Sequence, residues 1–104
     1  MTSISTHVLD TSLGKPAQGV PVELAQQVGG EWKALGASAT DADGRCKDLP
    51  VPDLASGTVL RLRFTTGGAF FPEVSIVFDV DPAQAHYHVP LLLNPFGYSV
   101  YRGS

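Results

Sequence analysis

Hydrophobic and polar residues alternate with a period of two along several short stretches of this chain. The alternation is clearest between residues 58 and 65, where the expected core face is Thr58, Leu60, Leu62 and Phe64. Two further stretches follow the same rule, with core faces expected at Val20, Val22 and Leu24 and at Val74, Ile76, Phe78 and Val80. Successive side chains of a strand point to opposite faces, so each stretch predicts a strand with one buried face. Helical periodicity is almost absent, which predicts an all-β antiparallel sandwich or barrel.

Turn-forming residues separate these stretches. Glycine, proline, aspartate and asparagine gather in short clusters such as those at 13–16, 41–44 and 94–95, and each of these residue types has a physical reason to favour a turn. The clusters leave about eight strands, predicted near residues 3–9, 19–28, 31–39, 45–49, 57–66, 73–80, 86–93 and 97–103. Residues 82–86 are expected to form a loop.

Length and composition narrow the class of protein. The 104 residues predict a single domain, 1–104, that folds without disulfides or a metal. A net charge of −3 provides no basic surface for nucleic acid or anionic lipid. No apolar run approaches the ~18 residues of a membrane helix and no secretory leader is recognisable, so we expect a soluble, cytoplasmic protein. The single Cys46 excludes an intramolecular disulfide and is expected to be a small packed side chain.

The predicted strand at 86–93 breaks the alternation, because it is apolar on both faces. Val89, Leu91 and Leu93 should lie on one face, and the other combines His88 with Pro90 and Leu92. A small domain must bury both faces or expose an apolar stripe, and such a stripe usually marks an interface. Self-association into a symmetric homo-oligomer is the expected result. Pro90 has no N–H to donate, which predicts an edge strand or a bulge.

Two histidines and an arginine are candidates for chemistry. The first strand should bury Ile4, Thr6 and Val8, which turns His7 outward. His88 lies on the mixed-polarity face of its strand, and Arg45 follows a tight turn that would fix its position. A neutral imidazole can take a proton from water near pH 7, and a planar guanidinium can hold an anionic, carbonyl-rich ring. Together they suit hydrolysis of an activated amide or ureide.

Two other kinds of site were weighed against this one. His86 and His88 are two residues apart, so both could project from one face of a strand and, with His7, form a three-histidine zinc site. The spacing is a weak signal and no fourth ligand accompanies it, so we expect no metal and place His86 at the exposed start of its strand. Ser104 is terminal and lacks the strand-to-helix turn of a nucleophilic serine, which argues against an acyl-enzyme.

Several motifs nevertheless identify a family. The chain resembles the 5-hydroxyisourate hydrolases, the transthyretin-related enzymes of purine breakdown, along nearly its whole length. The matching segments are His7-Val8-Leu9-Asp10-Thr11, Gly14-Lys15-Pro16-Ala17, Asp43-Gly44-Arg45, Phe71-Pro72-Glu73-Val74, His86-Tyr87-His88-Val89-Pro90-Leu91-Leu92 and Tyr101-Arg102-Gly103-Ser104. The closing tetrapeptide is the most specific, because it separates these enzymes from the hormone-carrying transthyretins.

The resemblance implies a transthyretin-like two-sheet antiparallel sandwich of about eight strands, assembled as a homotetramer, a dimer of dimers with catalytic grooves where dimers meet. It carries the catalytic roles onto His7, Arg45, His88 and Ser104, and substrate binding onto Arg45, Tyr101 and Ser104. Family members usually have a short helix between the fifth and sixth strands. Residues 65–72 are too short for one, so that helix is expected to be shortened or absent.

These features together predict an enzyme of urate degradation. We expect it to hydrolyse 5-hydroxyisourate to 2-oxo-4-hydroxy-4-carboxy-5-ureidoimidazoline without a cofactor, with a hydrogen-bonded pair of His7 and His88 activating water. Arg45 would anchor the substrate and Ser104 would hold a histidine or the water. The alternative is a transthyretin-like carrier that binds a small aromatic ligand in the channel between dimers. A carrier has no use for two outward imidazoles beside a guanidinium.

Overall fold

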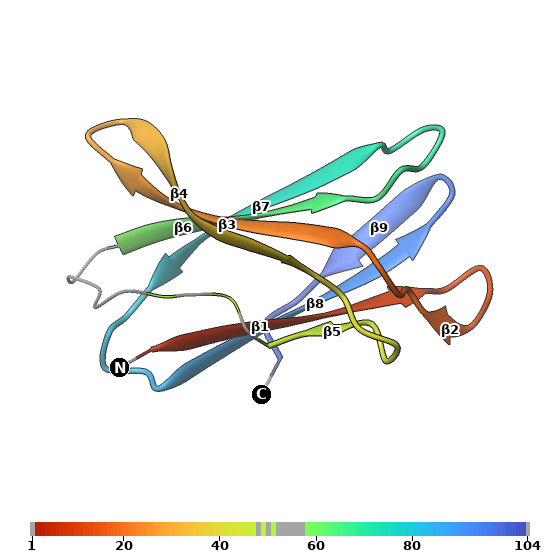
Figure 1. Ribbon diagram of the computed structural model, residues 1–104, viewed down its shortest axis with the longest axis horizontal. Helices are drawn as coiled ribbons and strands as arrows, with labels where there is room; N and C mark the ends of the chain where they lie inside the picture. The colour runs from red at the N-terminus through yellow and green to blue at the C-terminus, as the bar shows by residue number, and fades with distance from the viewer. Residues whose placement is uncertain (1, 48, 50, 52–57, 104) are drawn as a thin grey trace.

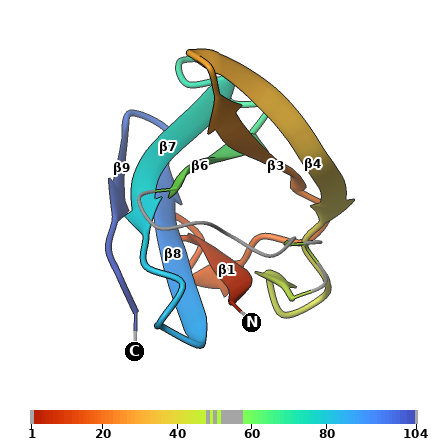
Figure 2. The same cartoon turned by 90° about the vertical axis from the view of Figure 1, so that its left-hand side faces the viewer.

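The protein folds into two stacked β-sheets (Figures 1 and 2). The computed structural model describes residues 2–47, 49, 51 and 58–103. The first sheet contains β2 (Lys15–Pro16), β1 (Ser3–Asp10), β8 (His86–Asn94) and β9 (Gly97–Val100) in that order, with β5 (Arg45–Cys46) also paired to β1. The second sheet has the order β4 (Glu31–Ala39), β3 (Pro21–Val28), β6 (Thr58–Thr65) and β7 (Glu73–Val80). The predicted all-β sandwich is confirmed.

The core lies between the sheets and is built from the faces that the alternation predicted. Leu60, Leu62 and Phe64 of β6 are completely buried, and Ile4 and Val8 of β1 pack against them within the same apolar cluster. One prediction for β3 was wrong: Ala25 was expected to face outward but is buried beside Leu24. The pairing of β3 with β4 shifts register between these two residues. A β-bulge of this kind interrupts the period of two, so consecutive side chains can both face the core.

No helix occurs in the described part of the chain, and so none there is long and apolar enough to span a membrane. Residues 66–72, where relatives were expected to have a helix, form a loop between β6 and β7, and residues 82–85 form a turn before β8. Both expectations are confirmed. In place of a turn, residues Lys15–Pro16 form the short strand β2, which pairs with the end of β1.

The strands β1 and β8 run parallel, although the sandwich was predicted to be antiparallel. The chain reaches β8 from β7 of the opposite sheet, so no hairpin turn fixes the direction in which it meets β1. Pro90 was placed on an edge strand or at a bulge; this was wrong, since β8 lies between β1 and β9. Regular pairing of β8 with β9 covers only Leu91 to Asn94. Pro90 lies just outside this β8–β9 ladder, so its missing N–H removes no hydrogen bond from it.

Two predicted strands are shorter than expected. The strand predicted at 45–49 is regular only at Arg45–Cys46, and Cys46 is buried as expected. The strand predicted at 97–103 ends at Val100, and the chain then returns to β8 through an isolated bridge between Gly103 and His88. Figure 2 shows this last segment running beside β8, on the side of that strand away from β1.

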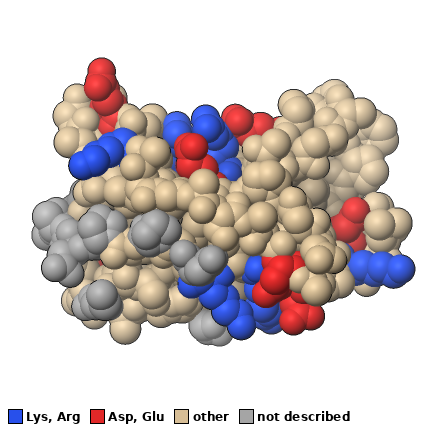
Figure 3. Space-filling model, viewed as in Figure 1, with Lys and Arg blue, Asp and Glu red and all other residues tan. Residues whose placement is uncertain are grey.

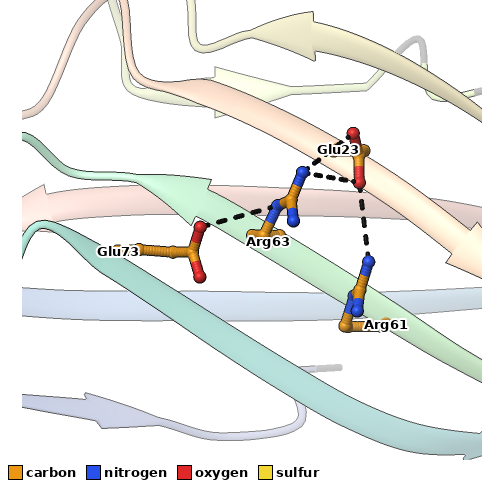
Figure 4. A network of polar contacts seen from close by, with 4 residues as sticks. All are labelled: Glu23, Arg61, Arg63 and Glu73. Carbon is orange, nitrogen blue, oxygen red and sulfur yellow. Dashed lines mark hydrogen bonds and ion pairs between the residues drawn. The ribbon is translucent and has the colours of Figure 1, made fainter. Parts of the chain in front are cut away.

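Charged side chains gather in two places in Figure 3: over the upper sheet and on the lower sheet close to β5. The upper group is an ion-pair network on the outer face of β3, β6 and β7 (Figure 4). Arg63 lies 3.1 Å from Glu23 and 3.6 Å from Glu73, and Arg61 lies 3.6 Å from Glu23. Partly exposed pairs of this kind add little stability. The network shows that the outer face of the upper sheet is exposed to solvent. The candidate catalytic residues His7, Arg45 and His88 lie on the lower sheet.

Candidate active site

Strand β1 brings the candidate residues together, because it pairs with β8 on one side and with β5 on the other. In the parallel ladder Ser5 lies opposite His88, and in the antiparallel ladder His7 lies opposite Arg45. Residues two apart on a strand share a face, so the polar side chains of β1 and β8 form one patch on the outer face of the lower sheet. Side chains more than eighty residues apart in sequence thus become neighbours.

A tight loop before β5 fixes Arg45. The carboxylate of Asp41 accepts hydrogen bonds from the backbone N–H groups of Asp43 (2.9 Å) and Arg45 (3.0 Å). These bonds, the one from Arg45 foremost, hold the pKa of Asp41 below its usual range. Gly44 has a φ of 75°, and a Cβ there would come closer than 3.0 Å to the carbonyl oxygen of Val8. Only glycine fits this conformation and this approach, so the Asp-Gly pair sets the start of β5.

The same loop orients His7. The Nε2 atom of His7 lies 2.8 Å from the carbonyl oxygen of Asp43. A carbonyl oxygen only accepts, so Nε2 carries the hydrogen and donates it. In the neutral imidazole, Nδ1 is then the basic nitrogen. The loop before Arg45 therefore positions both the start of β5 and the first histidine.

His88 is held from the opposite side by Ser5. The Nδ1 atom of His88 lies 2.8 Å from the Ser5 hydroxyl oxygen. Partial burial lowers the pKa of His88 from its ordinary value, and the positive charges of Arg45, His7 and His86 lower it further, against an opposing hydrogen bond to Ser5. A histidine with a lowered pKa is neutral at pH 7 and can accept a proton from water.

His7 and His88 do not form the hydrogen-bonded pair that the sequence analysis expected. The Nε2 atom of His7 is bound to Asp43, and Nδ1 of His88 is bound to Ser5. Each imidazole therefore has its own protein partner. The two still interact through charge, because protonated His7 lowers the pKa of His88.

A basin of about 520 Å³ lies over this patch. Its lining residues are Ser3, Ser5, Thr6, Arg45, Lys47, His86 and His88. Two cations and two histidines line it, and none of the described lining residues is an aspartate or glutamate. These positive groups suit an anionic, carbonyl-rich molecule. His7 is not among the lining residues, so Arg45 and His88 are the predicted catalytic pair that the basin brings together.

The C-terminal segment packs against His88. The backbone N–H of Gly103 donates to the carbonyl oxygen of His88 at 2.7 Å, and that of Tyr101 donates to Pro90 at 3.4 Å. The Arg102 guanidinium lies 4.7 Å from the centre of the Tyr87 ring. A Cβ on Gly103 would lie 2.7 Å from Cδ2 of His88. The His88 ring therefore packs so closely against position 103 that only glycine fits there. Ser104 lies outside the described residues.

Tyr101 does not line the basin of His88 within a single chain. Its half-exposed side chain lines a second cavity of about 720 Å³, bordered by β7 and β8. The expectation that Tyr101 and His88 share one groove is therefore not met in one subunit. Tyr101 directly follows β9, the neighbour of β8, but its side chain and that of His88 line different cavities.

His86 was expected to be exposed at a ragged strand start. It is exposed, but it is a regular member of β8 and its two ring nitrogens contact the hydroxyl groups of Ser3 and Ser5. Across the described ranges, no three histidine, cysteine, aspartate or glutamate side chains gather as a possible metal site. Sequence reasoning missed the roles of Ser5 and Gly103. The polar face of the first strand contained the signal for Ser5, and the closing tetrapeptide contained the signal for Gly103.

Comparison with known proteins identifies the family of this chain. A model of the HIUase/Transthyretin family matches residues 4–103. The 5-hydroxyisourate hydrolase of Salmonella dublin is 43% identical over 97% of this chain and 80% of its own length. The structure of Klebsiella pneumoniae 5-hydroxyisourate hydrolase superposes with a TM-score of 0.84 at 33% identity, over all of both chains. Sea bream transthyretin in complex with thyroxine gives 0.88 at 28% identity, covering 97% of this chain and 94% of that one. The chain belongs to the HIUase/transthyretin family.

Proposed function

We propose that this protein hydrolyses 5-hydroxyisourate, opening its six-membered ring to give 2-oxo-4-hydroxy-4-carboxy-5-ureidoimidazoline in urate degradation. The similarity to curated 5-hydroxyisourate hydrolases supports this activity over that of a carrier. The observation that carries the proposal is the position of His88. Its imidazole has a lowered pKa and shares a basin lined by cations with Arg45.

His88 is the general base in this mechanism. Its Nδ1 atom is bound to Ser5, which leaves Nε2 for water. Water loses a proton to Nε2 as its oxygen attacks the carbonyl carbon beside the ring nitrogen. A positioned base of this kind contributes about 10²- to 10⁴-fold to the rate. The choice of His88 over His7 rests on the basin, which His88 lines and His7 does not.

Arg45 binds the substrate and stabilises the oxyanion that forms at the attacked carbonyl. Its planar guanidinium can donate paired hydrogen bonds, and donors aimed at developing negative charge contribute about 10²- to 10³-fold. The proton that Nε2 of His88 took from water then passes to the leaving ring nitrogen, because His88 lines the basin. To His7, opposite Arg45 in the ladder, we assign an electrostatic role, since its charge lowers the pKa of His88. Collapse of the tetrahedral intermediate then breaks the carbon–nitrogen bond.

Ser104 and Tyr101 keep their proposed roles through the assembly. The resemblance implies that the Ser104 hydroxyl holds the water or a histidine, and the packing of Gly103 against His88 supports a role for the C-terminal segment. Tyr101 would reach substrate only if subunits meet over the lower sheet.

Large exposed apolar residues, including Phe70, Phe96 and Tyr98, support self-association. We propose a homotetramer, a dimer of dimers, that works in the cytoplasm without a cofactor, and light scattering at micromolar concentration should report about four times the chain mass.

A spectrophotometric assay tests the activity. Urate oxidase generates 5-hydroxyisourate in situ, and its decay is followed with and without the protein. We expect the protein to accelerate the decay, and to do so equally after dialysis against a chelator. Decay at the spontaneous rate would overturn the hydrolase assignment and favour the carrier. Activity lost on chelation and restored by zinc would instead favour the three-histidine metal site.

A further inference from the structure

We propose that Ser3, His86, Ser5 and His88 form a hydrogen-bond relay in which His86 and Ser5 are positioning residues: they fix the tautomer of His88 and carry its proton to the surface. The inference rests on the proposed function, since it concerns the base of that reaction. It adds two residues, Ser5 and His86, to a site otherwise made of His7, Arg45, His88 and the C-terminal segment.

The contacts form an unbroken line across the parallel pair β1/β8. The Ser5 hydroxyl oxygen lies 2.8 Å from Nδ1 of His88 and 2.8 Å from Nε2 of His86. The other nitrogen of His86, Nδ1, contacts the hydroxyl of Ser3. Ser3 is 3.4 Å from the carbonyl oxygen of Ala85. All four residues line the basin, and because Ser5 is buried and His86 is exposed, the line runs along its wall from the partly buried His88 to an exposed side chain.

Counting hydrogens along this line fixes its direction. We assign the Ser3 hydroxyl as a donor to the carbonyl of Ala85, which only accepts, and Ser3 then accepts a hydrogen from Nδ1 of His86. Neutral His86 then has its lone pair on Nε2, which accepts the only hydroxyl hydrogen of Ser5. Ser5 in turn accepts from Nδ1 of His88, so neutral His88 keeps its lone pair on Nε2, where the proposed mechanism needs a base.

The same line can pass on the proton that His88 takes up. When Nε2 of His88 gains the proton of water, its Nδ1 hydrogen moves to the Ser5 oxygen while the Ser5 hydrogen moves to Nε2 of His86. The Nδ1 hydrogen of His86 moves to the Ser3 oxygen while the Ser3 hydrogen leaves to solvent water. Each group gains one proton and loses one, and one proton reaches the surface. His88 is then neutral with its hydrogen on Nε2. That hydrogen passes to the leaving ring nitrogen, and a proton that returns from solvent along the same line to Nδ1 restores the first state.

The surroundings favour neutral histidines along the relay. Arg45 and His7 face His88 from β5 and β1, and His86 faces it from its own strand, each lowering the pKa of His88 when charged. Lys47 also lines the basin. In the C-terminal segment, Gly103 packs on the ring and Arg102 lies over Tyr87. A cation held on His88 is disfavoured among these positive charges, so a route that removes the proton has a physical benefit.

The relay is tested by separating His88 from His86. In Ser5→Ala the hydroxyl is lost, and in Ser5→Thr it is kept; Ser75→Ala, an exposed serine of β7, is the matched control. Nitrogen-15 NMR of the histidine rings should show the Nδ1–H tautomer of His88 in the intact protein and a mixture with the Nε2–H tautomer in Ser5→Ala. We expect kcat to fall about tenfold in Ser5→Ala, to recover in Ser5→Thr, and to be unchanged in Ser75→Ala.

His86→Gln completes the test, because a surface side chain can be replaced without disturbing the core. It should lower kcat severalfold, move the pH dependence of kcat, and add nothing when combined with Ser5→Ala, since both remove one relay. Multiplicative losses in the double variant, or an unchanged His88 tautomer in Ser5→Ala, would overturn the relay. The NMR readout needs no substrate. If the intact protein fails to hydrolyse 5-hydroxyisourate, the proposed function fails while the tautomer measurement still decides on the hydrogen-bond line.

Discussion

Gly103 lies directly against the imidazole of His88. Its N–H donates to the His88 carbonyl oxygen at 2.7 Å, and a Cβ at Gly103 would lie 2.7 Å from Cδ2 and 3.3 Å from Cγ of the ring. Cδ2 is bonded to Nε2, the nitrogen assigned as the base. The C-terminal segment and Ser5 therefore both contact the ring of His88.

Gly103→Ala should impair catalysis more than folding. The added methyl group would displace the His88 ring, because ring atoms and not a flexible chain end occupy the space. We expect kcat/KM to fall at least about tenfold, as small misplacements of a catalytic group can do, with Tm nearly unchanged. Gly97→Ala is the control, since its Cβ would make only ordinary contact, 3.5 Å, with Asn94. Equal activity in both variants would show that the packing of Gly103 on the ring is unimportant.

The pH dependence should reflect the lowered pKa of His88. Burial first, and then the charges of Arg45, His7 and His86, favour the neutral ring. The rate should rise with pH through a pKa below the usual value of about 6.5 and be level at pH 7 and above. The native state binds fewer protons than the unfolded chain between these two pKa values, so the free energy of unfolding should fall as pH falls through that window. NMR titration of His88 gives the pKa directly, and a value above 6.5 would contradict the electrostatic account.

Removing or extending the C-terminus should abolish or impair hydrolysis. Deletion of residues 101–104 removes the Gly103 contact with His88 and the Arg102 contact with Tyr87, but leaves the core between the sheets intact. We expect loss of activity with the circular dichroism spectrum retained. Gly103 packs against His88, so residues added after Ser104 would begin close to the proposed base, and we expect a C-terminal tag to be harmful and an N-terminal tag harmless. Full activity in the shortened or extended protein would remove the strongest support for a catalytic role of the tail.

Gly44→Ala should destabilise the protein through the loop that sets Arg45. Gly44 has a φ of 75°, and a Cβ at this position would also collide with the backbone of Val8. We expect a loss of about 2 kcal/mol or more in the free energy of unfolding, measured by urea denaturation. Gly14→Ala is the matched control, because Gly14 has a φ of 66° but nothing within 4 Å. Equal losses would mean that conformation alone, and not the approach to Val8, makes glycine necessary.

The sequence predicted the sandwich and the outward position of His7, because both depend on local alternation. It could not predict that Ser5 joins His88 to His86. That contact depends on a parallel register between strands more than eighty residues apart, and alternation within one strand contains no information about register. The expected pair of His7 and His88 failed for a similar reason. His7 binds the backbone carbonyl of Asp43. Every residue has such a carbonyl, so the sequence does not show which one a side chain will bind.

The most direct test of the account compares the intact protein with His88→Ala in the assay that generates 5-hydroxyisourate in situ. A base that accepts the proton of water should be worth about 10²-fold or more in kcat, while Arg45 should still bind substrate and leave KM within a fewfold of its original value. A fall in kcat of about 10²-fold, with the assembly unchanged by light scattering, is the predicted result. Near-normal turnover by His88→Ala would contradict the assignment of His88 as the base.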